Sequence, residues 1–187
     1  MSSQHDYRTI CKNFKDGGWV KTIQGLKIGF AIALLPCTGM AEVKQPQNIW
    51  QFIPAASSAI KSLSINDVDN ALLTFRSSKE NEYIHFYKAK PFKLADGLRI
   101  SDIELRLSKN RLGMRPMLVF TVLNQCITIA RVKEHYHYLS MSDYPRGHSE
   151  NEVTSFSTSA NISGQKISFS FMVKDPVCLA SVVIAGD

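Results

Sequence analysis

Apolar and polar residues alternate one by one along several short stretches of this chain. Isoleucine or leucine occupies positions 103, 105 and 107, and Glu104 and Arg106 stand between them. Residues 166–173 show the same alternation, with phenylalanine at two of the apolar positions. Successive side chains of a β-strand point to opposite faces of its sheet, so this pattern predicts strands that bury one face.

Eight segments after residue 70 have a strand-like composition, and clusters of Gly, Asn, Asp, Ser or Pro separate most of them. The expected strands are Ala71–Phe75, Glu82–Lys88, Ile100–Leu107, Met117–Leu123, Cys126–Leu139, Val153–Thr158, Lys166–Val173 and Cys178–Ile184. A loop with one short helix over Ala55–Leu63 is expected before them, because Pro54 should interrupt a longer helix. The sequence therefore predicts an all-β fold, a single β-sandwich or a small barrel of about eight strands.

Residues 20–41 have the order of features that is typical of a secretory signal peptide. Two lysines precede an apolar run, Pro36 follows it, and small residues stand at the −3 and −1 positions before a cleavage site after Ala41. The apolar run is shorter than the roughly 20 residues that span a bilayer, so no transmembrane anchor is expected. Residues 1–41 are thus predicted to be a leader, and residues 42–187 a single β-domain that is periplasmic or secreted.

Two alternatives concern the leader. Val20 can be encoded by GTG, which bacteria use as a start codon, and our hypothesis is that translation begins there and that residues 1–19 are a mis-annotated extension. Cys37 suggests a lipid anchor, although Pro36 stands where a lipid-attachment site normally has a small residue.

Loss of the leader changes the charge of the chain. The full sequence has 22 basic and 16 acidic residues, whereas residues 42–187 have 17 and 14, a net charge of +3. Eight basic residues and three acidic residues lie between positions 88 and 115. The eight basic residues are Lys88, Lys90, Lys93, Arg99, Arg106, Lys109, Arg111 and Arg115. Two interpretations are open: solvated strand and turn surface, or a basic face that attracts an acidic partner over long range. The acidic partner would be an acidic protein, or anionic lipid or glycan headgroups. Nucleic acid is not an expected partner of an exported protein.

Two cysteines, Cys126 and Cys178, remain in residues 42–187. Exported proteins work in compartments that favour disulfides, so we expect these two to pair and to join two strands of the core. The alternative is two separate buried thiols. Neither cysteine belongs to a Cys-x-x-Cys motif or has an adjacent histidine, and a catalytic thiol is therefore not expected.

His135 and His137 are the candidate metal ligands. On the strand expected over residues 126–139 they would share one face, and His85 or His148 would have to supply a third ligand. No spacing in the sequence fixes that third ligand. No metal or other cofactor is therefore predicted, and the two histidines remain a weak alternative.

Residues 42–187 contain no nucleophile elbow, P-loop or His-Glu-x-x-His helix, and the Ser-x-x-Lys match from Ser58 to Lys61 lacks the other elements that this motif requires. We therefore expect a non-enzymatic binding protein, such as an inhibitor or immunity protein that acts on an acidic protein. One alternative is a fimbrial or adhesin-type subunit that assembles through an open sheet edge. The other is a periplasmic metal-binding protein that uses His135 and His137. The sequence does not determine the oligomeric state.

Overall fold

The described residues form nine β-strands in one antiparallel sheet. The structure is a computed structural model, and it describes residues 46–110, 113–159 and 164–186. The predicted leader, with its cleavage site, its alternative start and Cys37, lies outside these residues, and so does Arg111.

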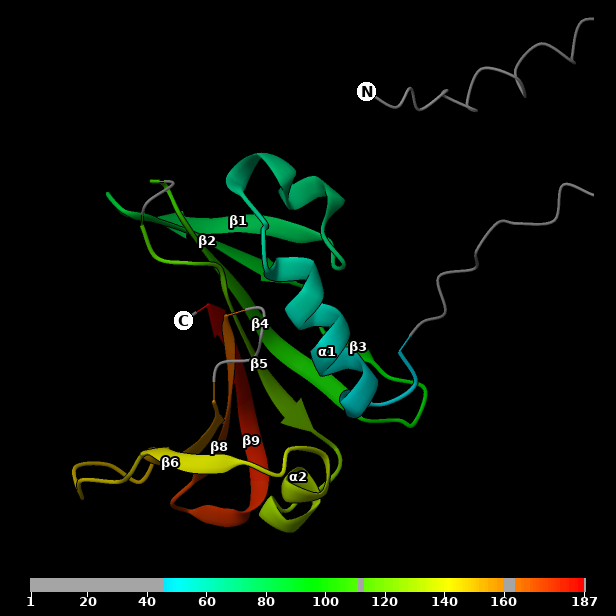
Figure 1. The fold of residues 1–187 in the computed structure, drawn as a ribbon, viewed down its shortest axis with the longest axis vertical. Helices are drawn as coiled ribbons and strands as arrows, with labels where there is room; N and C mark the ends of the chain where they lie inside the picture. The colour runs from blue at the N-terminus through cyan, green and yellow to red at the C-terminus, as the bar shows by residue number, and fades with distance from the viewer. Residues whose placement is uncertain (1–45, 111–112, 160–163, 187) are drawn as a thin grey trace, which may run out of the picture. The chain divides into compact units, whose positions relative to one another are not determined.

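The strands run in the order β1-β2-β4-β5-β9-β8-β7-β6, and the short β3 also pairs with β4 (Figure 1). Their bounds are β1 Phe75–Glu80, β2 Ile84–Ala89, β3 Phe92–Lys93, β4 Arg99–Ser108, β5 Met117–Leu123, β6 Leu139–Asp143, β7 Val153–Thr158, β8 Gln165–Met172 and β9 Asp175–Gly186. The helices are α1 Ile49–Ile60, the 3-10 helix η2 Ile65–Asn70 and α2 Ile129–His135. None of the helices within the described ranges is long and apolar enough to span a bilayer.

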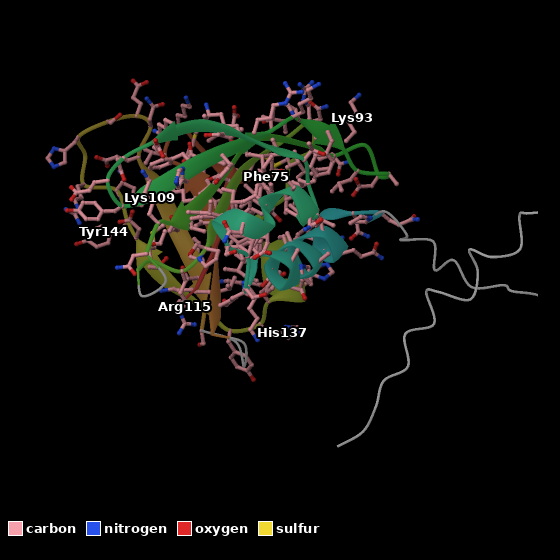
Figure 2. All side chains as sticks on the ribbon, turned by 90° about the horizontal axis from the view of Figure 1, so that it is seen from above. Phe75, Lys93, Lys109, Arg115, His137 and Tyr144 are labelled. Atoms are coloured by element: carbon pink, nitrogen blue, oxygen red, sulfur yellow. A yellow bond between two sulfur atoms is a disulfide. The ribbon has the colours of Figure 1, made fainter. Side chains whose placement is uncertain are left out.

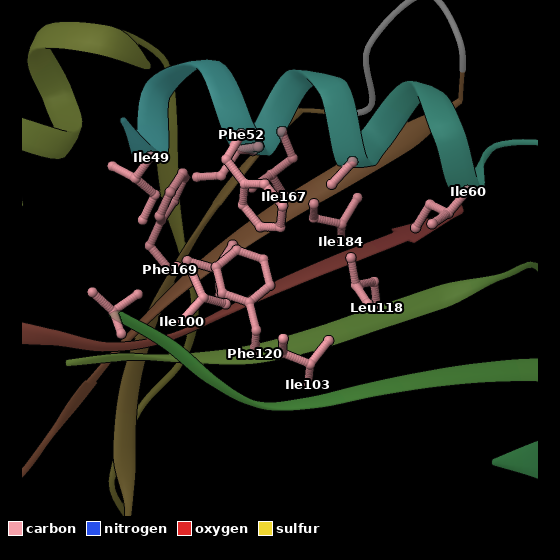
Figure 3. Close-up of a cluster of buried hydrophobic side chains, with 14 of the residues drawn as sticks. Ile49, Phe52, Ile60, Ile100, Ile103, Leu118, Phe120, Ile167, Phe169 and Ile184 are labelled. Carbon is pink, nitrogen blue, oxygen red and sulfur yellow. The ribbon is translucent and has the colours of Figure 1, made fainter. Parts of the chain in front are cut away.

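The expectation of a β-rich fold is confirmed, but the sandwich and the barrel are both wrong. β1 and β6 lie at the two edges of the sheet and do not pair with each other, so the sheet does not close. A sandwich would cover the apolar face with a second sheet. Here α1 packs on that face instead (Figure 3).

Helix α1 is longer than predicted because one side of it packs against the sheet. Ile49, Phe52, Ile53 and Ile60 are at most 3% exposed, and their spacing of three, four and seven residues places them on one side of a helix. Burial of each such side chain stabilises the fold by roughly 1.5–3 kcal/mol. A proline inside a helix costs about 3 kcal/mol, so this packing outweighs Pro54 and the helix continues through it.

The centre of the core is a group of aromatic rings between α1 and the sheet (Figure 3). Phe52 meets Phe120 of β5 edge to face, with ring centroids 5.3 Å apart, and it meets Phe92 of β3 at 5.4 Å. Edge-to-face contacts at this distance are a preferred geometry for aromatic pairs. Phe52 therefore joins the helix both to the middle of the sheet and to its β3 margin.

One polar pair also holds α1 to the sheet. The hydroxyl of Ser57 donates to Gln165 Oε1 at 2.7 Å, and Gln165 Nε2 donates to the carbonyl oxygen of Ser57 at 2.8 Å. Ser57 is 5% exposed and Gln165 is 3% exposed. Buried polar groups need such partners, so this pair fixes the position of the helix along β8.

The strand expected over residues 126–139 is wrong, because α2 occupies its middle. The hydroxyl of Thr128 accepts a hydrogen bond from the backbone N–H of Arg131 at 3.3 Å and caps the helix. Val132 is fully buried, and the ring of Tyr136 packs 5.0 Å from Phe169. Burial raises the pKa of Tyr136 to about 12.

The other strand predictions differ from the structure mainly at their ends. β5 and β7 have the predicted bounds, whereas β3 and β6 were not predicted. The strand expected over Ala71–Phe75 reaches the sheet only at its last residue, where β1 begins. The strand expected from Cys178 begins earlier, since β9 starts at Asp175 and the turn before it lies at residues 173–174.

The predicted disulfide is confirmed, since Cys126 and Cys178 are bonded with their Cα atoms 4.7 Å apart. The bridge joins the loop before α2 to β9, rather than two strands as expected. Beside it, the backbone N–H of Leu179 donates to the carbonyl oxygen of Ile127 at 2.8 Å. The two contacts together attach the α2 segment to the sheet.

Substitution Ser57→Ala should lower the free energy of unfolding by about 1–3 kcal/mol, because it removes one hydrogen bond of a buried pair. Ser58→Ala is the matched control, since Ser58 is exposed on the same helix and should change stability by less than about 0.5 kcal/mol. Urea unfolding followed by circular dichroism measures both. Equal effects of the two substitutions would contradict the role assigned to Ser57.

Removal of the disulfide should lower the free energy of unfolding by about 2–4 kcal/mol, because the bridge closes a loop between residues 52 positions apart. Unfolding of the wild type with and without reductant, beside the double variant Cys126→Ser/Cys178→Ser, measures this loss. The double variant should not respond to reductant. A wild type that is equally stable in both conditions would show that the bridge does not constrain the chain.

Candidate binding site

A pocket of about 720 Å³ lies where β1 begins and β2 ends. Its lining comes from α1, from the segment that leads into β1, from both strands and from the connection to β3. The lining residues are Pro46, Phe52, Leu72, Leu73, Thr74, Arg76, Lys88, Ala89, Lys90, Pro91 and Phe92. Its volume is within the range of roughly 300–1,000 Å³ that is typical of ligand sites.

The apolar part of the pocket is fixed by the core. Phe52 is 1% exposed, so α1 holds its ring in place, and the edge-to-face contact with Phe52 orients Phe92. Leu73 packs against the core, whereas Leu72 is 41% exposed. The pocket thus combines a rigid apolar wall with one exposed leucine.

The charged part of the pocket is entirely basic. Arg76, Lys88 and Lys90 line it, and no acidic residue does. Arg76 and Lys88 stand directly opposite each other across β1 and β2. Arg76 lies outside the basic segment 88–115 and joins it only through the strand register, so the order of residues in the sequence does not predict its place here.

A second like-charge pair lies beside the first. Lys93 and Arg99 are directly opposite each other across β3 and β4, and both are exposed. We call Arg76, Lys88, Lys90, Lys93 and Arg99 the cationic end. Among the described residues, no carboxylate forms an ion pair with any of these five side chains. Like charges directly opposite each other destabilise a sheet. This end of the sheet therefore contains two cross-strand pairs that lower the stability of the protein.

Three of the other predicted basic residues have hydrogen-bond or ion-pair partners outside the cationic end. Arg106 pairs with Glu104 at 2.8 Å, and Lys109 pairs with Glu80 at 2.9 Å. The hydrogen bond and charge of Lys109 lower the pKa of Glu80, and the charge of His85 adds to this effect. Arg115 donates to the carbonyl oxygen of Gly164 at 3.5 Å.

The seven predicted basic residues that the structure describes therefore do not form one cluster. Arg99 begins β4 and Lys109 follows its last residue, so the two lie at opposite ends of a ten-residue strand. In Figure 2, Lys93 lies on one side of the molecule, and Lys109 and Arg115 lie on the other. Lys88, Lys90, Lys93 and Arg99 are the predicted residues that belong to the cationic end.

The geometry expected for the two candidate metal ligands is wrong. His135 is the last residue of α2, and its ring stacks on Trp50 with centroids 4.0 Å apart, so His135 and His137 do not share a strand face. His85 Nδ1 lies 3.1 Å from the carboxylate of Glu80, and His148 is in the loop between β6 and β7. The described part of the chain holds no group of three His, Cys, Asp or Glu side chains placed to bind a metal ion.

The loop between β6 and β7 is held by one carboxylate. Glu152 accepts hydrogen bonds from the backbone N–H groups of Arg146, Gly147 and His148 at 2.6–2.9 Å. The bonds from Gly147 and His148 lower the pKa of Glu152 most. The loop also carries Tyr144, which is 64% exposed. This loop lies on the same side of the molecule as Lys109 (Figure 2).

The chemistry available in the pocket is that of binding an anion that also has an apolar part. The basic groups offer charge and hydrogen-bond donors, and the aromatic wall offers apolar contact. No family model, no curated protein and no solved structure matches this chain.

Lys93→Glu should stabilise the protein by about 0.2–1 kcal/mol at low salt, because it turns a like-charge pair with Arg99 into an opposite-charge pair. High salt should reduce the gain, since both side chains are exposed. Lys174→Glu, at an exposed position in the turn between β8 and β9, is the control with the same change in net charge, and it should stay within about 0.5 kcal/mol of the wild type. Urea unfolding at two salt concentrations measures these differences. A loss of stability in Lys93→Glu would show that the pair carries no repulsion.

Proposed function

We propose that this protein is an exported, non-enzymatic binding protein of the inhibitor or immunity type, and that its partner is an acidic protein. The observation that carries the proposal is the cationic end, with two like-charge pairs beside an apolar pocket. The patch costs stability in the free protein and none of its cations forms a described ion pair, although Lys88 also stands opposite Glu104 of β4. Such a patch is suited to a partner that supplies negative charge.

The physical roles of the two parts of the site differ. Exposed cations attract an acidic partner over long range and orient its approach. An apolar pocket with a fixed aromatic wall accepts a side chain that becomes fully desolvated, which is where binding energy concentrates in protein interfaces. Together they support a binding function in which the charges guide the partner and the pocket anchors it.

Export is supported by two features. The order of residues in 20–41 is typical of a signal peptide, and the disulfide between Cys126 and Cys178 is of the kind that persists in oxidising compartments. We therefore place the protein in the periplasm or outside the cell, with a lipid anchor at Cys37 as the alternative.

Capture from a periplasmic extract tests the proposal. The wild type should retain one acidic protein in a stoichiometric complex, and Lys88→Glu/Lys90→Glu should lose it because two pocket cations are reversed. Lys133→Glu/Lys174→Glu has the same change in net charge at exposed positions that do not line the pocket, and it should retain the partner. The proposal is contradicted if the captured protein binds the Lys88→Glu/Lys90→Glu variant equally well. It is also contradicted if repeated experiments capture no protein.

A structural subunit of a fimbria or adhesin is the second candidate. It is favoured by edge strand β6, which has no charged residue before Asp143 and exposes Met141. Uncharged edge strands tend to pair with other chains. A structural subunit would form concentration-dependent polymers in size-exclusion chromatography, whereas the binding protein would form one discrete complex.

A further inference from the structure

We propose that the partner presents an extended segment in which acidic and apolar residues alternate, and that this segment adds to the sheet along the outer side of β3. The inference rests on the proposed function and names the kind of partner segment that the cationic end receives. It is carried by a gap in the strand pairing, by the two faces of the sheet at that gap, and by their different chemistry.

The gap lies in line with β1. Pairing between β1 and β2 begins at Phe75 opposite Ala89, so no described strand lies beside residues 90–93 on that side. β3 pairs only with β4, and the described backbone hydrogen bonds include none on its outer side. A sheet edge of this kind presents N–H and C=O groups that an extended peptide can pair with.

The two faces of the sheet differ at the gap. Phe92 faces α1, since its ring contacts Phe52. Lys93, the next residue of the strand, therefore points to the opposite face, together with its cross-strand partner Arg99. The same alternation separates Ala89, which pairs with Phe75, from Lys88, which pairs with Arg76.

Successive side chains of a strand placed in the gap would lie on the two faces of the sheet in turn. Its side chains on the α1 face would enter the pocket beside Phe92 and Leu72, and those on the other face would lie near the cations. Alternating apolar and acidic residues satisfy both faces at once. A wholly acidic segment would place carboxylates against the aromatic wall, which is costly without partners there.

Charge complementarity selects the acidic segment over a neutral or basic one. Five basic side chains without a described ion-pair partner surround the gap, and the pocket lining contains no carboxylate. The pocket volume of about 720 Å³ can accept more than one apolar side chain, as an extended segment requires. A long-chain carboxylate has the same two chemical parts, and the experiment distinguishes it from a peptide.

The test uses three synthetic probes and the folded protein with its disulfide intact. They are a hexapeptide of alternating Glu and Leu, a peptide of the same composition with three Glu followed by three Leu, and sodium dodecanoate. Titration calorimetry gives the affinities, and amide NMR shifts locate the bound probe. The alternating peptide should bind at least about tenfold more tightly than the block peptide and should shift the amides of Lys90, Phe92 and Lys93.

Two matched variants separate the pocket from general surface effects. Leu72→Glu adds a negative charge at the pocket mouth and should weaken the alternating peptide roughly tenfold or more. Val177→Glu makes the same change at an exposed apolar residue of β9 and should leave the affinity within about twofold. Both positions are exposed, so neither substitution threatens the fold.

The outcomes distinguish this inference from the proposed function. Equal binding of the two peptides, shifts elsewhere on the sheet, or binding of dodecanoate alone would overturn strand addition. If Leu72→Glu still captures the acidic protein partner, the proposed function stands and the inference fails. If the alternating peptide binds as expected but no acidic protein depends on Lys88 and Lys90, the strand site stands and the proposed function fails.

Discussion

The packing of α1 across one face of the sheet is the contact on which most of the structure depends. The helix buries Ile49, Phe52, Ile53 and Ile60 against strands that are far apart in sequence, and no second sheet covers that face in the described chain. A single open sheet would expose a continuous apolar surface without it. The same helix forms one wall of the pocket, because Phe52 lies between the core and β3.

The like-charge pairs of the cationic end lower the stability of the free protein. Cross-strand pairs usually join opposite charges, and this sheet also does so within the cationic end, where Lys88 stands opposite Glu104 of β4. At the margin near β3 it twice joins like charges instead, beside an apolar pocket. Local costs of this kind tend to concentrate where a protein binds something, because optimisation for stability alone would remove them.

The sequence allowed the prediction of those features that depend on local pattern. The predicted bounds of β5 and β7 agree with the structure, and the pairing of Cys126 with Cys178 follows from the count of cysteines outside the predicted leader. The sequence predicts a strand where α2 lies, because the β-branched and aromatic residues of this segment favour strands. The cap by Thr128 and the burial of Val132 stabilise the helix instead of a strand. The burial depends on the tertiary structure, which the local sequence does not show.

The candidate site could be predicted only in part, because some of its residues come together only through tertiary contacts. Four of its five cations lie in the basic segment that the sequence shows, but Arg76 joins them through its pairing with Lys88. The apolar wall was not predicted, since Phe52 and Phe92 are 40 residues apart in sequence and meet through the packing of α1. The extension of α1 past Pro54 has the same origin, because burial outweighs the local preference.

The association rate constant for the acidic partner, measured by stopped flow against salt concentration, tests the central claim most directly. Steering by the cationic end predicts that this rate constant falls by roughly tenfold or more between low and high salt, while the dissociation rate constant changes far less. An association rate constant that does not depend on salt would contradict the claim that the unpaired charges at this end of the sheet exist to meet a partner.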